Sequence, residues 1–71
     1  MKKYLVIIEK SDTGYGAYVP DLPGCVATAP TKDEVERLIY EGIQFHIEGL
    51  ELEGLSIPVA SSEAETMVFA D

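Results

Sequence analysis

The chain has 71 residues, with 13 acidic and 5 basic side chains, one cysteine, one histidine and a formal net charge of −8. This length allows one small domain and excludes a second, a single cysteine excludes an internal disulfide, and a single histidine argues against a multi-ligand metal site. A chain of this size buries only about 60% of its unfolded surface, so we expect it to associate into a homo-oligomer.

The charge is unevenly distributed along the chain. Residues 1–37 hold five basic and six acidic residues, a net charge of −1, whereas residues 38–71 hold seven acidic residues and no Lys or Arg, a net charge of −7. Because a second half this acidic repels phosphate groups, we expect no direct nucleic-acid binding. The acidity either attracts a basic protein partner or keeps a small domain soluble, and charge alone does not separate these two explanations.

The apolar run near the start of the chain is short. Leu5–Ile8 follows two lysines but is ended by Glu9, whereas a secretory signal needs about 7–15 apolar residues and a membrane helix about 20. We therefore expect no membrane association. Together with the lone cysteine, this predicts a cytoplasmic protein.

Three short strands are predicted in the first 29 residues. Residues 4–8 are apolar and β-branched, residues 11–14 are turn formers, and residues 15–19 alternate as a second strand. Pro20 has no amide hydrogen to give to a ladder, so the second strand ends there. After a stiff Pro- and Gly-containing connection, residues 25–29 form the third strand.

A helix is predicted after Pro30. Thr31 and Glu34 have the spacing of a capping box, and Gly49 and Gly54 are the two plausible ends. Its apolar face is Val35, Leu38, Ile39, Gly42, Ile43, His46 and Leu50.

The segment Thr66–Phe69 is predicted as a fourth strand. The fold class is therefore α+β in the order β-β-β-α-β, a three-stranded antiparallel meander with one helix packed on a face. The free edge of such a sheet is an assembly surface unless something covers it.

Cys25 and His46 are the only conventional nucleophile and base available. Catalysis requires their side chains within hydrogen-bond reach, whereas a free cysteine usually packs as a small hydrophobe and a histidine in an apolar stripe is usually a packed one. The remaining motifs for catalysis, phosphate binding or metal binding are missing. We expect no enzyme activity, no cofactor and no metal, and a third, minor hypothesis is a small enzyme acting through this pair.

Glu48, Glu51 and Glu53 cluster at the predicted C-terminal end of the helix, where the helix dipole disfavours negative charge by about 0.3–1 kcal/mol each. Local stability does not explain this placement. Either the helix end is solvated and mobile, or these carboxylates meet a cationic partner.

Four stretches together resemble the HicB-like antitoxin family, and the second is the most specific. They are residues 4–10, residues 14–25 with Val19-Pro20-Asp21-Leu22-Pro23-Gly24-Cys25, the Thr31-x-x-Glu34 pattern, and residues 46–50 leading to Ile57-Pro58. The resemblance implies a partial ribonuclease-H-like fold, assembly as a dimer or tetramer, and binding to a small basic HicA-like toxin whose messenger-RNA cleavage is blocked.

The same resemblance frames the functional hypotheses. We expect residues 1–71 to form a single HicB-like domain without the C-terminal DNA-binding domain that full-length family members usually carry. The leading hypothesis is neutralisation of the toxin by occlusion, and the alternative is an orphan interaction or structural protein without a toxin. The partner-binding candidates are Asp21, Leu22, Pro23, Glu48 and Glu51. The three loop residues are equally well explained as a rigid turn that fixes strand register.

Overall fold

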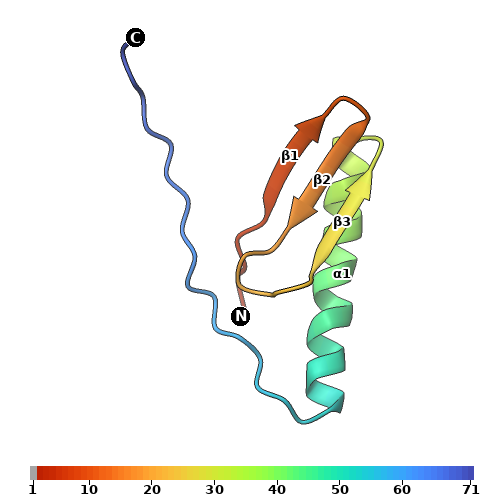
Figure 1. Ribbon diagram of the computed structural model, residues 1–71. Helices are drawn as coiled ribbons and strands as arrows, with labels where there is room; N and C mark the ends of the chain where they lie inside the picture. The colour runs from red at the N-terminus through yellow and green to blue at the C-terminus, as the bar shows by residue number, and fades with distance from the viewer. Residues whose placement is uncertain (1) are drawn as a thin grey trace.

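The computed structural model describes residues 2–71. It contains three strands and one helix, namely β1 (Ile7–Ser11), β2 (Gly14–Tyr18), β3 (Val26–Ala29) and α1 (Lys32–Leu52). The strands form an antiparallel sheet in the order β1-β2-β3, and α1 covers one face of it (Figure 1). The predicted meander with one helix on a face is confirmed.

Strand β1 begins and ends three residues later than the sequence predicted. Its ladder with β2 runs from the pair Ile7–Tyr18 to the pair Ser11–Gly14. The backbone N–H of Val19, the next residue after β2, donates instead to the carbonyl oxygen of Cys25 at 3.2 Å. Residues 2–6 therefore have no strand partner on β2, and the ladder starts where β2 ends.

The connection between β2 and β3 is two successive tight turns. The N–H of Leu22 donates to the carbonyl of Val19 at 3.0 Å, and the N–H of Cys25 donates to the carbonyl of Leu22 at 3.1 Å. The second turn carries Pro23 and then Gly24 with φ of 84°, the residue pair that a type II turn favours. The result is that the Leu22 side chain points inward and is fully buried.

Helix α1 begins and ends where its capping residues predict. The Thr31 hydroxyl oxygen accepts a hydrogen bond from the Glu34 backbone N–H at 3.2 Å, as in an N-cap. After Leu52 the chain turns at Gly54, which has φ of 69°, and the N–H of Leu55 donates to the carbonyl of Leu50 at 2.9 Å. Of the two predicted ends, Gly54 is therefore confirmed.

The core lies between α1 and one face of the sheet. Its buried residues are Ala17, Val19, Leu22, Cys25, Val35 and Ile39. Tyr15 packs against this core, whereas Tyr18 belongs to the opposite face and is 40% exposed. That open face carries Ile7, Tyr18 and Val26 side by side in register across the three strands.

The segment that follows α1 corrects one prediction. Thr66–Phe69 forms no strand within the chain, so the observed order among residues 2–71 is β-β-β-α. Residues 55–71 instead run as an extended segment, called the tail below, beside the sheet but unpaired with it (Figure 1). The apolar, β-forming residues of this segment are not sufficient, because a strand also requires a neighbouring strand to receive its backbone hydrogen bonds.

Within residues 2–71, α1 does not combine the length and the apolar character that crossing a membrane requires.

Candidate functional site

A groove lies between β3 and α1 on one flank of the helix. We call it the β3 groove; its volume is about 430 Å³. Glycines line it at positions 24, 42 and 49, so backbone is accessible there, and the side chains of Val26 and Phe45, each 69% exposed, also line it. This groove therefore offers apolar surface that is accessible to another molecule.

An exposed row of side chains on α1 runs past this groove. Residues 38, 41, 45, 48 and 52 are spaced by three and four, so they share one side of the helix. They are Leu38, Glu41, Phe45, Glu48 and Leu52, and we call them the α1 stripe. Phe45 is 69% exposed and Leu52 is 88% exposed. The stripe thus alternates apolar and acidic side chains in solvent.

Sequence reasoning missed this stripe. The sequence predicts Leu38 on the apolar face, but it is exposed in the structure, and Phe45 and Leu52 lie outside the predicted apolar face. The signal was the seven-residue spacing of Leu38, Phe45 and Leu52, which places apolar side chains on a second side of the helix.

The acidic candidates Glu48 and Glu51 lie exposed near the C-terminal end of α1, and Glu53 lines the β3 groove. The last turn of the helix contains no basic residue. Among residues 2–71 the only ion pair is Arg37 with Glu41, at 3.7 Å and largely exposed. Such an exposed ion pair contributes little to stability. It also lies away from the C-terminal end of α1, so the negative charge of that end is not compensated by a basic side chain of the last turn.

The three loop candidates lie in different environments. Leu22 is buried in the core, Pro23 is exposed next to Gly24 of the β3 groove, and Asp21 is turned toward the tail. Pro23 is therefore the chain neighbour of a groove residue, and Leu22 has a packing role in the core. Whether these residues bind a partner stays a prediction.

Asp21 accepts four hydrogen bonds from the tail. Its Oδ2 accepts the backbone N–H groups of Ser61 and Ser62 at 3.0 Å each, and its Oδ1 accepts the two serine hydroxyls at 3.2 and 2.9 Å. The pKa of Asp21 is lowered below 3.8, mainly because the backbone N–H groups of Ser62 and Ser61 donate hydrogen bonds to its carboxylate. A second contact, from the Tyr4 hydroxyl to the carbonyl of Pro58 at 2.7 Å, holds the tail nearby.

Cys25 and His46 both line the β3 groove. Cys25 is buried, and desolvation raises the pKa of its thiol above the ordinary value of 9.0. This environment disfavours the thiolate that a nucleophilic cysteine needs. No group of three or more His, Cys, Asp or Glu side chains suited to a metal ion occurs among residues 2–71.

Comparison with known proteins identifies the family. A family model described as the HicB-like antitoxin of bacterial toxin–antitoxin systems matches residues 4–70. The chain belongs to this HicB-like antitoxin family. The resemblance found in the four sequence stretches is thereby confirmed.

Relatives of this HicB-like chain occur in bacteria, archaea and a phage. It is 41% identical over 66 residues to a UPF0150 protein of Thermoplasma acidophilum, covering 92% of this chain and 96% of that protein. It is 45% identical over 47 residues to an uncharacterized 14.9 kDa protein of Haemophilus phage HP1, covering 66% of this chain. That match spans only 35% of the phage protein's own length.

A solved structure has the same fold. One chain of a structure described as the HicA3 and HicB3 toxin–antitoxin complex superposes with a TM-score of 0.71 at 30% sequence identity. The match covers 84% of this chain and 70% of that chain. The HicB-like fold predicted from the sequence is therefore confirmed.

Proposed function

We propose that this HicB-like protein acts by binding, without catalysis, and neutralises a small basic HicA-type ribonuclease toxin by covering its active site. Family membership and the similarity to a chain of a toxin–antitoxin complex support an antitoxin role. The raised thiol pKa of Cys25 supports a binding role rather than a nucleophilic one.

The single observation that carries this proposal is the α1 stripe beside the β3 groove. Phe45 and Leu52 are large apolar side chains held in solvent on a rigid helix, which is how interface anchors are presented. Glu48 lies between them on the same side, and Glu51 is nearby at the uncompensated helix end. A basic partner is steered by the carboxylates and then buries the apolar side chains.

The proposed division of labour gives each candidate a role. Glu48 and Glu51 speed association and respond to salt, because exposed charges act mainly on the on-rate. Phe45 and Val26 provide the contact that holds the complex, with Pro23 at the groove's border. Asp21 contributes by holding the tail, and Leu22 by fixing the loop from within the core.

Co-expression with a small basic HicA-type protein, sought among the genes that neighbour this one, tests the proposal. We expect a co-purifying complex, and restored growth when the basic protein alone arrests it. Reversing the helix charges with E48K/E51K should slow association at least tenfold at low salt. The matched double reversal E63K/E65K in the tail should change it less than threefold. A stable fold with no complex and no growth rescue would instead support the orphan interaction protein.

A further inference from the structure

One edge of the sheet is open along its whole length. Strand β1 pairs with β2 on one side only, because the sheet order is β1-β2-β3 (Figure 1). No strand among residues 2–71 pairs with its other edge, whose backbone N–H and C=O groups form a template for another strand.

Beneath this edge lies a second groove, on the flank of α1 opposite the β3 groove. We call it the β1 groove; its volume is about 350 Å³. It is lined mainly by apolar side chains from β1 and its N-terminal extension on one side and from α1 on the other. These include Val6, Ile8, Ile39, Tyr40 and Ile43. A fourth strand on β1 would place alternate side chains directly over this groove.

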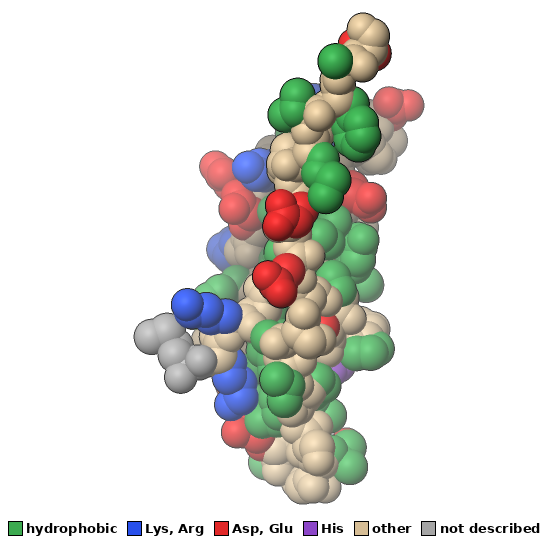
Figure 2. Space-filling model, turned by 90° about the vertical axis from the view of Figure 1, so that its left-hand side faces the viewer, with side chains coloured by type: hydrophobic (Ala, Val, Ile, Leu, Met, Phe, Trp, Pro, Cys, Tyr) green, Lys and Arg blue, Asp and Glu red, His purple; other side chains and the backbone are tan. Residues whose placement is uncertain are grey.

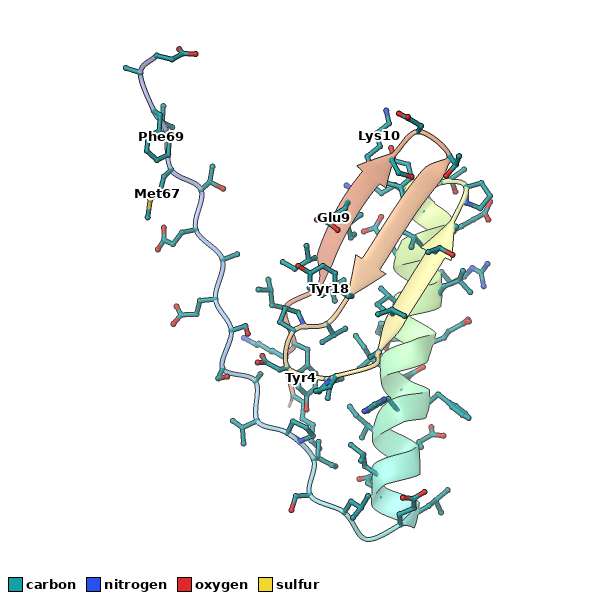
Figure 3. All side chains as sticks on the ribbon, in the orientation of Figure 1. Tyr4, Glu9, Lys10, Tyr18, Met67 and Phe69 are labelled. Atoms are coloured by element: carbon teal, nitrogen blue, oxygen red, sulfur yellow. The ribbon has the colours of Figure 1, made fainter. Side chains whose placement is uncertain are left out.

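The tail carries a segment with the chemistry to fill it. Met67 is 69% exposed and Phe69 is 82% exposed, and both stand clear of the sheet (Figure 3). Residues two apart in an extended chain point to the same side, so these two side chains form one apolar face. The radius of gyration is 14.1 Å, against about 11 Å for a compact chain of this length, because the tail projects outward.

The base of the tail is fixed and its end is not. Asp21 holds Ser61 and Ser62, and Tyr4 holds Pro58. Within residues 2–71, no hydrogen bond to a side chain is made beyond Ser62. Residues 63–71 reach about 30 Å when extended, which is longer than a five-residue strand. The tail is thus an anchored arm that reaches outward from its own body.

The tail is acidic, whereas the β1 edge carries charges of both signs. Glu63 and Glu65 of the tail are exposed, and Figure 2 shows acidic side chains, in red, on this side of the molecule. Glu9 and Lys10 both lie on β1, and Lys2 and Glu36 both line the β1 groove. The β1 edge and its groove therefore carry balanced charge, and the fit of the tail rests on its apolar face.

We propose that residues 64–70 add as a fourth strand to the β1 edge of a second copy of this chain, with Met67 and Phe69 filling its β1 groove. The second copy returns its own tail in the same way, so the exchange closes as a two-fold dimer. The fixed base and outward course of the tail favour exchange over closure onto its own β1. The family match extends to residue 70, so this arm belongs to the domain.

The first test measures assembly of the full chain alone, by sedimentation equilibrium. The dimer dissociation constant should rise at least 30-fold in M67D/F69D. In T66D/V68D, which adds the same charge on the alternate side of the arm, it should rise less than threefold. Circular dichroism checks that α1 is retained in both variants. Equal effects of the two variants, or a monomeric unmodified chain, would overturn the proposal.

A second test separates exchange from self-closure. Isotope-labelled and unlabelled chains are mixed, and only contacts between copies are detected by filtered nuclear Overhauser spectroscopy. We expect contacts of the Phe69 ring with Ile8 and Ile39 of the other copy. The same contacts found only within one copy would overturn the exchange. Both tests use this chain without a toxin, so their outcome is independent of the proposed antitoxin function.

Discussion

Asp21 and Ser62 are joined by two hydrogen bonds across 41 residues, one from the serine N–H at 3.0 Å and one from its hydroxyl at 2.9 Å. Asp21 belongs to the tight connection between β2 and β3, and Ser62 belongs to the tail. Two segments outside the regular elements therefore fix each other, and the loop that the sequence suggested as a partner contact is also the anchor of the tail.

Removing the Asp21 carboxylate should release the tail. In Asp21→Ala, four hydrogen bonds are lost, so the amides of Ser61 and Ser62 should lose their protection from hydrogen exchange while the amides of α1 keep theirs. Asp12→Ala removes an exposed aspartate from the β1–β2 turn and should leave the tail unchanged. Equal protection of both serine amides in the two variants would show that other contacts hold the tail.

Lowering the pH should release the same anchor. The pKa of Asp21 in the folded chain lies below 3.8, because the Ser62 and Ser61 N–H groups stabilise the carboxylate. The stabilisation is therefore complete above the unfolded pKa of about 3.9 and is lost as the pH falls through the lower, folded value. An amide NMR titration should show Ser61 and Ser62 changing together below pH 3.8, and Asp21→Asn should abolish that transition.

The buried leucine of the double turn should be a major contributor to stability. Leu22 is fully buried, so Leu22→Ala removes core contacts and should lower the free energy of unfolding in urea by about 2–5 kcal/mol. Leu52→Ala makes the same chemical change at a site that is 88% exposed and should cost less than about 0.5 kcal/mol. A small loss at Leu22 would mean that the loop is not part of the core.

The Cys25 thiol should be unreactive in the folded protein. Burial raises its pKa above 9.0, so less thiolate is present at any given pH than for a free cysteine. Iodoacetamide at pH 8 should therefore label the native chain much more slowly than the urea-unfolded chain. Rapid labelling of the native chain, with a rate dependent on His46, would revive a nucleophilic role.

Much of the fold was predictable because its signals are local. Thr31 and Glu34 set the start of α1, Gly54 sets its end, and Pro20 closes β2, each through backbone chemistry visible in a few neighbouring residues. The three-stranded meander followed from short connections between alternating segments.

The remaining features depend on distant contacts. The composition of Thr66–Phe69 does not reveal whether a neighbouring strand exists, and the prediction of a fourth strand within the chain was wrong. The anchor between Asp21 and Ser62 joins residues with no shared local pattern. The exposure of Phe45 depends on how α1 is rotated about its axis against the sheet. The apolar periodicity alone predicts a wide buried face and does not determine this rotation.

The affinity of Phe45→Ala for the proposed HicA-type toxin tests the central claim most directly. Tyr40→Ala is the matched control, because Tyr40 is an aromatic residue of α1 with similar exposure, 64% against 69%, but it lines the opposite, β1 groove. Titration calorimetry is performed after light scattering shows that both variants keep the assembly state of the unmodified chain. We predict that Phe45→Ala weakens binding at least tenfold and Tyr40→Ala less than threefold. Unchanged affinity in Phe45→Ala would contradict the assignment of the α1 stripe as the toxin-binding surface.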